Sequence, residues 1–450
     1  MPAHNEIPKS IALFEKARQV LPGGTTRATV VADPSPIYIQ EGRGPRLIDV
    51  DGNSYLDLVN NYTALIHGHG FQPVVEAVKG QIGKGSCFAN PTELEILLSQ
   101  ILCERVPGLE KLRFVTTGTE ATMYALKAAR AYTGRTKIAK FEGAYHGAYD
   151  YVETSENSGP DNWGPISQPA RVRYATGTPD SVLEQTVIVP FNDIENTLIC
   201  LERAKSELAC LLVDLVPSRG GLIPLEPDYI AAIQDFCKET GILIVSDEVL
   251  NFRQGYGGAA AAFGLEPDLI TIGKIIGGGL PIALVGGGDA VMEVFDSASR
   301  KPLVPQGGTF AANPLSLVAG IAAMTALDRP ALERLNAKGE RLRAALRETI
   351  ATSEMPISVT GAGSLFRLHM RPSEPRTYRE FYPSPQAQAL NRYIVKSLLG
   401  RGIYLPETST SSLTTAMEES DLAQVVAAFR ATLESAECRD LAAPIRAASH

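Results

Sequence analysis

Three groups of polar residues follow apolar runs of the sequence that have the length and composition of β-strands. They are Asp247 with Glu248, Lys274, and the segment Thr117-Gly118-Thr119. Because ligands of an α/β sheet bind beyond the carboxyl ends of its strands, we expect these groups to meet at one edge. Taken singly, each group is typical of a structural role, such as a turn, a solvated loop or a helix cap. Three of them at three strand ends of one sheet favour a binding site.

The residue types indicate which ligand this edge would hold. The N–H groups of Gly118 and Thr119, with the hydroxyls of Thr117 and Thr119, would form a cup for a phosphate at a helix N-terminus. The segment is not a nucleotide P-loop, because no Gly-Lys-Ser/Thr follows it. A buried Asp247 would keep a pyridinium nitrogen protonated, and Lys274 offers an amine for a Schiff base and for proton transfer. Together these groups predict a site for pyridoxal 5'-phosphate (PLP).

The elements around these residues predict a sheet covered by helices. Apolar runs alternate with helical patterns from about residue 90 to 320, which indicates a largely parallel sheet with helices on both faces. The expected strands are 111–115, 137–141, 210–214, 242–245 and 269–272, and the clearest helices are 94–106, 119–132 and 227–240. The remaining expected elements are a helix at 11–20, a hairpin turning at Asp51-Gly52-Asn53, and amphipathic helices at 327–350, 384–399 and 421–437.

This change of pattern predicts two domains. We expect residues 71–320 to form a large, ligand-binding α/β domain. Residues 321–450 are expected to form a smaller α+β domain, against which the N-terminal segment 1–70 packs.

Composition excludes several classes of protein. The 450 residues are 44% hydrophobic and 20% charged, which is ordinary for a globular protein and excludes disorder and fibrous repeats. Lys plus Arg number 42 against 50 Asp plus Glu, and this net charge of -8 argues against nucleic acid or an anionic membrane as a partner. No apolar run approaches the ~20 residues of a membrane span.

The cysteines and the N-terminus predict the compartment. The six cysteines form neither a CxxC pair nor a Cys/His pattern at ligand spacing, so neither disulfides nor a metal site are expected. Buried free thiols are typical of a reducing compartment. The N-terminal residues carry charges and lack the apolar stretch of a signal peptide. We therefore expect a cytoplasmic protein with small-molecule ligands.

Several longer motifs contain these residues and occur in a defined order. They are Leu21-Pro22-Gly23-Gly24 with Arg27, Thr117-Gly118-Thr119-Glu120-Ala121, Phe141-Glu142-Gly143-Ala144-Tyr145-His146-Gly147, Asp247-Glu248-Val249, Gly273-Lys274-Ile275-Ile276-Gly277-Gly278-Gly279, and Gln306-Gly307-Gly308-Thr309-Phe310 with Asn313-Pro314. With these motifs the chain resembles the class III aminotransferases of the PLP fold type I superfamily, from about Pro22 to Arg430. It is most similar to the group that contains glutamate-1-semialdehyde aminomutase and the β-amino-acid aminotransferases.

The resemblance implies a fold and an assembly. The implied fold is α/β, of PLP fold type I, with a mainly parallel seven-stranded sheet in the large domain and a smaller α+β domain. The implied assembly is a homodimer in which Thr309 reaches the phosphate bound by the partner subunit.

The resemblance also implies roles for individual residues. Tyr145 corresponds to the aromatic residue that stacks on the cofactor ring. Arg27 corresponds to an arginine that binds a substrate carboxylate through two charge-assisted hydrogen bonds. His146 is equally compatible with a place beside the cofactor and with a structural role.

Three segments depart from the patterns of the family. Asp214-Leu215 stands where the family usually has Glu-Pro, so Asp214 receives no role. The segment Leu250-Asn251-Phe252-Arg253 is one residue shorter than in the aminomutases, and Asn61-Tyr62-Thr63-Ala64 replaces a tryptophan-containing stretch. The last two departures resemble the β-amino-acid aminotransferases.

The leading prediction is a PLP-dependent aminotransferase that moves an amino group from a carboxylated amine, with a β-amino acid as one candidate, to a keto acid. The first alternative is an intramolecular aminomutase of the glutamate-1-semialdehyde type, and another is a PLP racemase or epimerase. A non-catalytic binding protein is disfavoured because Lys274 and Asp247 are both present. A nicotinamide enzyme is disfavoured because Gly277-Gly278-Gly279 lacks the Gly-x-Gly-x-x-Gly spacing.

Overall fold

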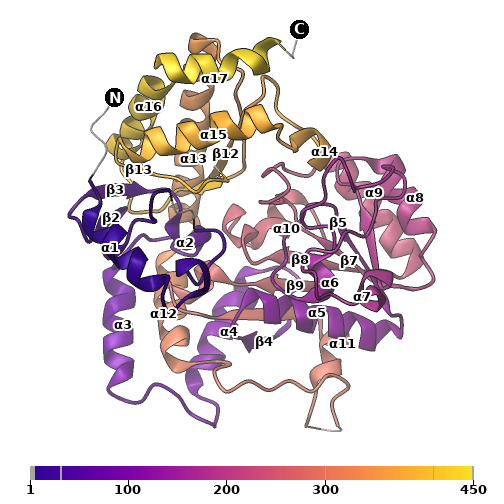
Figure 1. Cartoon of the computed structure of the whole chain (residues 1–450). Coiled ribbons are helices and arrows are strands. Elements are labelled where there is room, and N and C mark those ends of the chain that lie inside the picture. The colour runs from indigo at the N-terminus through magenta and orange to yellow at the C-terminus, as the bar shows by residue number, and fades with distance from the viewer. Residues whose placement is uncertain (1–5, 31–32, 299–300, 409, 448–450) are drawn as a thin grey trace.

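A seven-stranded sheet forms the centre of the molecule in the computed structural model, which describes residues 6–30, 33–298, 301–408 and 410–447 (Figure 1). Its strands, in the order in which they pair, are β4 (Lys111–Val115), β10 (Ala283–Gly287), β9 (Leu269–Ile272), β8 (Leu243–Glu248), β7 (Leu208–Val213), β5 (Lys137–Phe141) and β6 (Thr186–Val189). Strand β10 is antiparallel to both of its neighbours, and the other pairs are parallel. The mainly parallel seven-stranded sheet of the expected α/β fold is thereby confirmed.

Both faces of this sheet are apolar because successive side chains of a strand point to opposite sides. In β7, Cys210 and Leu212 pack on the side of α5 (Gly118–Thr133), whereas Leu211 and Val213 pack on the side of α9 (Pro227–Thr240). Helix α8 (Ile194–Glu202) joins α9, and α11 (Asp289–Met292) joins α5. The sheet is thus the middle layer of three (Figure 1).

Local signals place the helices that lead to and from the sheet. Helix α5 begins after Thr117, whose side chain forms a capping box with Glu120, and it ends at Gly134 in the left-handed conformation. Helix α9 begins with Pro227 in its first turn and ends at Gly241, also left-handed.

Two smaller sheets complete the strand architecture. One has the order β1 (Ile39–Arg43), β2 (Arg46–Asp49), β3 (Ser54–Asp57) and β13 (Ile403–Tyr404), and the other β11 (Ser358–Thr360), β12 (Leu365–His369) and β14 (Thr410–Ser412). The predicted hairpin at Asp51-Gly52-Asn53 connects β2 to β3. Because β13 pairs in parallel with β3, the N-terminal segment and the C-terminal region share a sheet.

The remaining helices lie mainly around these sheets. They are α1 (Pro8–Ala17), α2 (Asn60–Thr63), α3 (Gln72–Ile82), α4 (Glu93–Arg105), α6 (Asp150–Glu153), α7 (Asp180–Glu184), α10 (Gly258–Phe263), α12 (Pro314–Ala326), α13 (Arg329–Ser353), α14 (Tyr378–Phe381), α15 (Pro385–Leu399), α16 (Glu419–Leu433) and α17 (Ala436–Ala447), with 3₁₀ turns η1 (Pro22–Gly24), η2 (Asn251–Gln254), η3 (Lys274–Gly277) and η4 (Glu293–Phe295). The predicted boundary after residue 320 falls inside α12, so a boundary there would have to lie at one end of that helix. The domain limits stay predictions.

Two helix predictions differ from the structure by more than small shifts of the helix ends. The helix expected at 421–437 is divided into α16 and α17, because the Ser435 hydroxyl accepts a hydrogen bond from Cys438 N and starts a new helix. The opening helix lies three residues earlier than expected, since Pro8 is well suited to a first helical turn.

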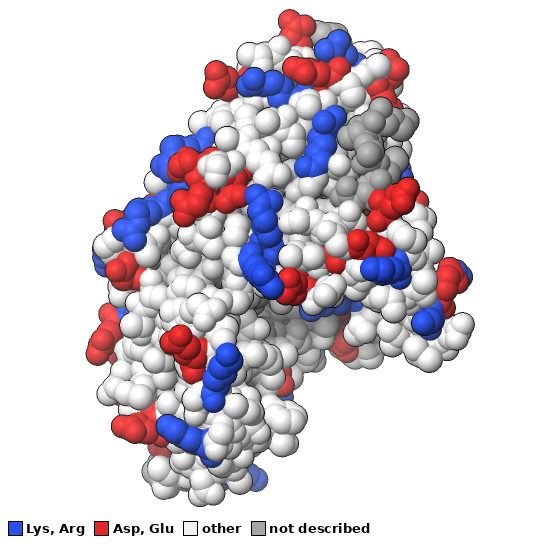
Figure 2. Space-filling model, turned by 90° about the vertical axis from the view of Figure 1, so that its left-hand side faces the viewer, with Lys and Arg blue, Asp and Glu red and all other residues white. Residues whose placement is uncertain are grey.

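The surface and the thiols bear on possible partners. Acidic and basic side chains are interspersed on the face shown in Figure 2, and its described residues form no continuous basic patch. Within the described ranges, no single helix has the length and apolar composition to cross a membrane. The pair α12 and α13, bent by 76°, meets that criterion on length and composition alone. All six cysteines are free, and four are buried as expected, but Cys87 is exposed and Cys103 is half-buried.

Candidate active site

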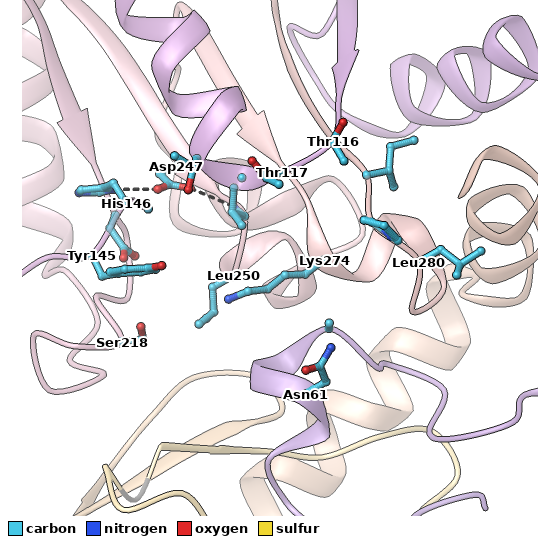
Figure 3. A pocket seen from close by; sticks show the side chains of 18 of the residues that line it. Asn61, Thr116, Thr117, Tyr145, His146, Ser218, Asp247, Leu250, Lys274 and Leu280 are labelled. Carbon is cyan, nitrogen blue, oxygen red and sulfur yellow. Dashed lines mark hydrogen bonds and ion pairs between the residues drawn. The ribbon is translucent and has the colours of Figure 1, made fainter. Parts of the chain in front are cut away.

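A cavity of about 350 Å³ lies at the carboxyl ends of the central strands (Figure 3). Six of the eight predicted site residues line it, and these are Thr117, Gly118, Thr119, Tyr145, Asp247 and Lys274. The other two, Arg27 and Thr309, are exposed and lie outside this lining. The parallel sheet therefore brings together the three groups that the sequence places at separate strand ends.

Asp247 is held by a dense set of hydrogen bonds. Its Oδ2 lies 2.7 Å from His146 Nδ1, and its Oδ1 accepts from Val249 N at 3.0 Å and Thr271 Oγ1 at 3.1 Å. Burial alone would raise the pKa of Asp247, but the hydrogen bond and charge of His146, with the other two donors, lower it below its ordinary value. Asp247 is thus held as a carboxylate in a buried site.

His146 is the residue whose role the sequence left open. It is 3% exposed, and burial lowers its pKa, so the neutral ring donates Nδ1–H to Asp247. The Nε2 atom is buried without a hydrogen-bond partner in the described part of the chain. His146 therefore acts on the site by orienting Asp247.

Lys274 has a strained backbone conformation and an amine whose pKa is lowered. Its φ of 50° is in the left-handed region, which costs energy for any residue other than glycine and often marks functional positions. Burial lowers the pKa of its amine to about 8, although Asp247 and Asp214 attract the charged form. An amine with this pKa is a nucleophile and a proton carrier near neutral pH.

Glu248, beside Asp247 in the sequence, does not line the cavity. Its carboxylate accepts hydrogen bonds from Ala259 N and Ala260 N, at the start of α10.

Asp214 lines the same cavity and has unusual surroundings. Its Oδ1 accepts hydrogen bonds from Val216 N at 3.1 Å and Asn251 Nδ2 at 2.5 Å. Burial, and after it the charge of Asp247, raises the pKa of Asp214 well above its ordinary value. The pKa values of the two neighbouring carboxyl groups are therefore shifted in opposite directions, upward for Asp214 and downward for Asp247.

The first turn of α5 matches the requirements of a phosphate cup. Thr117 caps Glu120 N, and the N–H groups of Gly118 and Thr119 donate to no acceptor in the described ranges. A Cβ on Gly118 would lie 2.7 Å from Val249 Cγ1, so only glycine leaves room between this turn and the cavity wall.

Tyr145 lies at the side of the cavity and is 41% exposed. The guanidinium of Arg219 lies 4.6 Å from the centre of its ring, a cation–π arrangement. Arg219 in turn pairs with the buried carboxylate of Glu156. Tyr145 therefore borders both the cavity and Arg219, which places an aromatic ring within reach of a ligand in the cavity.

Arg27 reaches the cavity wall through Asn61. Its Nη1 donates to Asn61 Oδ1 at 3.0 Å, and Asn61 lines the cavity. The guanidinium also lies 5.7 Å from the ring centre of Tyr62. Arg27 is thus placed beside the cavity by a segment 34 residues further along the chain.

Sequence reasoning missed several residues of the site. One of them is His146, whose hydrogen bond to Asp247 was not predicted. The others, for which no role at the cavity was predicted, are Asp214, Asn251, Arg219 and Asn61. Only His146 stood inside a recognised motif, and a buried histidine within reach of a carboxylate could have been proposed from it. The other contacts depend on how distant loops pack, for which the sequence carries no local signal.

The residues of the cavity fit PLP. The N–H groups of Gly118 and Thr119 are free donors at a helix N-terminus that lines the cavity, and the buried carboxylate of Asp247 is suited to a protonated ring nitrogen. The amine of Lys274 would hold the cofactor covalently. When bound, PLP supplies an electron sink for the breaking of bonds at the amine-bearing carbon.

Comparison with known proteins agrees with this fit. The family model for aminotransferase class-III matches residues 28–428. The chain belongs to the class III aminotransferase family. It is a PLP-dependent aminotransferase, with the α/β fold of PLP fold type I.

Individual relatives cover nearly the whole aminotransferase. Glutamate-1-semialdehyde 2,1-aminomutase of Methanothermobacter thermautotrophicus is 38% identical over 431 residues, which are 95% of this chain and 98% of the relative. The solved structure of an ω-transaminase from Sphaerobacter thermophilus is 44% identical, with a TM-score of 0.91 and coverage of 95% and 98%. That of a β-phenylalanine aminotransferase from Variovorax paradoxus is 31% identical, with a TM-score of 0.85 and coverage of 94% and 93%.

Proposed function

We propose that this aminotransferase takes its amino group from a β-amino acid and passes it to a keto acid. The observation that carries the proposal is the place of Arg27, which is hydrogen-bonded to a residue of the wall of the cavity that holds Lys274. A guanidinium there suits a carboxylate on the same molecule as the reacting amine. The similarity to a β-phenylalanine aminotransferase supports this substrate class.

The chain's own residues divide the work as follows. Lys274 holds the cofactor, takes the proton from the amine-bearing carbon of the donor, and later supplies a proton to the former keto carbon of the acceptor. Asp247, oriented by His146, favours the protonated ring nitrogen, and Tyr145 stacks on the ring. Thr117, Gly118 and Thr119 bind the phosphate. Arg27 binds the substrate carboxylate.

A half-reaction screen tests the proposal. The absorbance of the bound cofactor is followed while α-, β- and γ-amino acids and simple amines are added one at a time, with no keto acid present. β-Amino acids should react fastest at low concentration. A clear preference for α-amino acids or for amines without a carboxylate would contradict the assignment.

The alternative, an aminomutase of the glutamate-1-semialdehyde type, is favoured by the 38% identity to such an enzyme. The two activities differ in whether the amino group leaves with a separate product. Conversion of glutamate-1-semialdehyde to its isomer without consumption of a keto acid would establish the alternative. Keto-acid-dependent release of an oxo product from a β-amino acid would establish the aminotransferase.

The active unit is proposed to be a homodimer, in which Thr309 reaches the phosphate of the partner subunit. Thr309 is exposed, and its segment contacts a second one through Cys87 Sγ and Thr309 O at 3.6 Å. Phe88 and Phe310, beside these residues, are 47% and 61% exposed. Two exposed phenylalanines on contacting segments are typical of an interface.

A cytoplasmic location is part of the same proposal. Its support is that all six cysteines are free, as expected in a reducing compartment.

A further inference from the structure

The short turn α2 has a backbone that its residues do not favour. Four consecutive residues, Asn60, Asn61, Tyr62 and Thr63, have φ values of 50°, 49°, 54° and 74°. Positive φ values raise the energy of every residue that has a Cβ, and they raise it less for asparagine than for tyrosine or threonine. A turn of this kind persists only where its surroundings enforce it, and such places are often functional.

Contacts from both sides enforce the turn. Asp57 Oδ1 accepts hydrogen bonds from Val59 N and Asn60 N, each at 2.9 Å. The buried side chain of Asn60 donates to Ser412 O at 2.8 Å, which ties the turn to strand β14 of the C-terminal region. The strained conformation is thus set by packing between distant parts of the chain.

The result of the turn is that Asn61 and Tyr62 hold Arg27. Asn61 Oδ1 accepts the hydrogen bond from Arg27 Nη1 at 3.0 Å, and the Tyr62 ring lies below the guanidinium. Tyr62 is itself fixed by the contact of its hydroxyl with Thr29 Oγ1 at 2.7 Å. In Figure 3, Asn61 points toward the cavity from the side opposite Asp247, with the Lys274 amine between them.

The charge of Arg27 is left available by this arrangement. Within the described residues, Arg27 makes no ion pair with a carboxylate, and its side chain donates a hydrogen bond only to the neutral amide of Asn61. A guanidinium has five N–H donors, so a single neutral acceptor leaves a pair free for a carboxylate. An aspartate at the same position would neutralise the cation before the substrate arrived.

We propose that Asn61 is a positioning residue for substrate selection: it holds the Arg27 guanidinium beside the cavity through an uncharged contact, so that the substrate carboxylate becomes its counter-ion. This inference rests on the proposed function, because it assumes that Arg27 receives a carboxylate. It goes further in naming what places Arg27 and why an amide stands there.

Asn61→Asp is the sharpest variant. Aspartate has the shape of asparagine and also tolerates the left-handed region, so the turn should be kept and only the charge altered. The donors are β-phenylalanine and a 1-arylethylamine of similar size that has no carboxylate, in the half-reaction without keto acid. Binding of 3-phenylpropionate, which has a carboxylate but no amine, gives a readout that involves no turnover.

The expected result is a selective loss of carboxylate binding. Asn61→Asp should weaken binding of β-phenylalanine and 3-phenylpropionate by about 10- to 100-fold, chiefly in the dissociation constant. The loss with the amine should be at least about tenfold smaller. Asn61→Gly, which favours the turn but removes the amide, should weaken carboxylate binding by only about 3- to 10-fold. Thr29→Val removes only the hydroxyl contact that fixes Tyr62 and keeps the Asn61 amide, so it should separate the two donors less than Asn61→Asp does.

The double variant Arg27→Ala/Asn61→Asp decides between the outcomes. If Asn61 acts through Arg27, the added aspartate should have little further effect once Arg27 is absent. An equal effect in both backgrounds, or equal losses with β-phenylalanine and the amine, would overturn the inference. If Arg27→Ala itself does not separate the two donors, the proposed substrate class fails. If Arg27→Ala separates them and Asn61→Asp does not, the inference alone fails.

Discussion

The two walls of the active-site cavity are built in different ways. On one wall Asp247 and His146 are 6% and 3% exposed, and Asp247 accepts three hydrogen bonds within 3.1 Å. On the other, Arg27 and Asn61 are exposed and share one hydrogen bond of 3.0 Å. The first wall consists of strand ends and loops of one sheet, and the second of an N-terminal segment tied to the C-terminal region.

This difference indicates that the site separates the catalytic step from the recognition of the substrate. Charges in a buried, hydrogen-bonded wall interact strongly and keep their protonation states, because little water screens them. An exposed guanidinium gains much less until a substrate excludes the water around it. Variants of the buried wall should therefore impair every substrate, whereas variants of the exposed wall should distinguish among substrates.

The largest effect is expected at the centre of the buried wall. Lys274→Ala removes the amine that holds the cofactor and carries the proton, so turnover should fall by at least about 10³-fold with every donor. Borohydride reduction of the wild-type holoenzyme and peptide mapping should place the cofactor on Lys274. Lys140 is an internal control, because it is fully buried and donates to Ala144 O and Thr154 O. Label on Lys140 would contradict the assignment.

The second-largest loss of turnover is expected for Asp247→Asn. The amide keeps the shape but cannot stabilise a protonated ring nitrogen, so turnover should fall by roughly 10²- to 10³-fold with carboxylated and simple amines alike. Single-turnover rates with both kinds of donor measure this. A loss confined to carboxylated donors would remove the distinction between the two walls.

Arg27→Ala tests the exposed wall. Loss of a bidentate ionic contact worth about 2–4 kcal/mol should lower kcat/KM for carboxylated amines by roughly 30- to 1,000-fold. The kcat/KM for a simple amine without a carboxylate should change little. Arg27→Lys keeps the charge without the planar pair of donors and should recover only part of the activity. Equal losses with both donors would place Arg27 in support of the fold or the cofactor.

A pH profile sharpens the role of His146. The hydrogen bond from His146 helps to lower the pKa of Asp247, so its carboxylate is charged above that pKa and is lost as pH falls through it. His146→Ala should raise that pKa, which moves the acid limb of kcat/KM to higher pH, and should lower the maximum by about tenfold. His146→Asn can keep a donor near Asp247 and should restore part of the shift. An unchanged acid limb in both variants would contradict the orienting role.

The smallest effect is expected at Thr309. If its hydroxyl reaches the partner's phosphate, Thr309→Ala should weaken PLP binding by about 3- to 10-fold and leave the dimer intact. Phe310→Asp, which places a charge in the proposed interface, should instead shift the protein toward monomers in light scattering. A fully active monomer would contradict the assembly.

Much of the fold and of the buried wall follows from local features of the sequence. Strands 137–141 and 269–272 have the bounds that their apolar runs predict, and helix α5 begins and ends at its capping residues. The strands β6 and β10 are missing from the predicted strands, and for β10 the reason is that its run ends in glycines, which weaken a strand signal. Lys274 and the phosphate cup were found because they directly follow strands.

Only the tertiary structure decided how the site residues pair. His146 and Asp247 are 101 residues apart, Arg27 and Asn61 are 34 apart, and Asn60 and Ser412 are 352 apart. The sequence by itself determined which side chains stand at the sheet edge, since strand periodicity and helix caps act over a few residues. Which side chains meet across the cavity depends on long-range packing, which also enforces a backbone in α2 that its own residues disfavour.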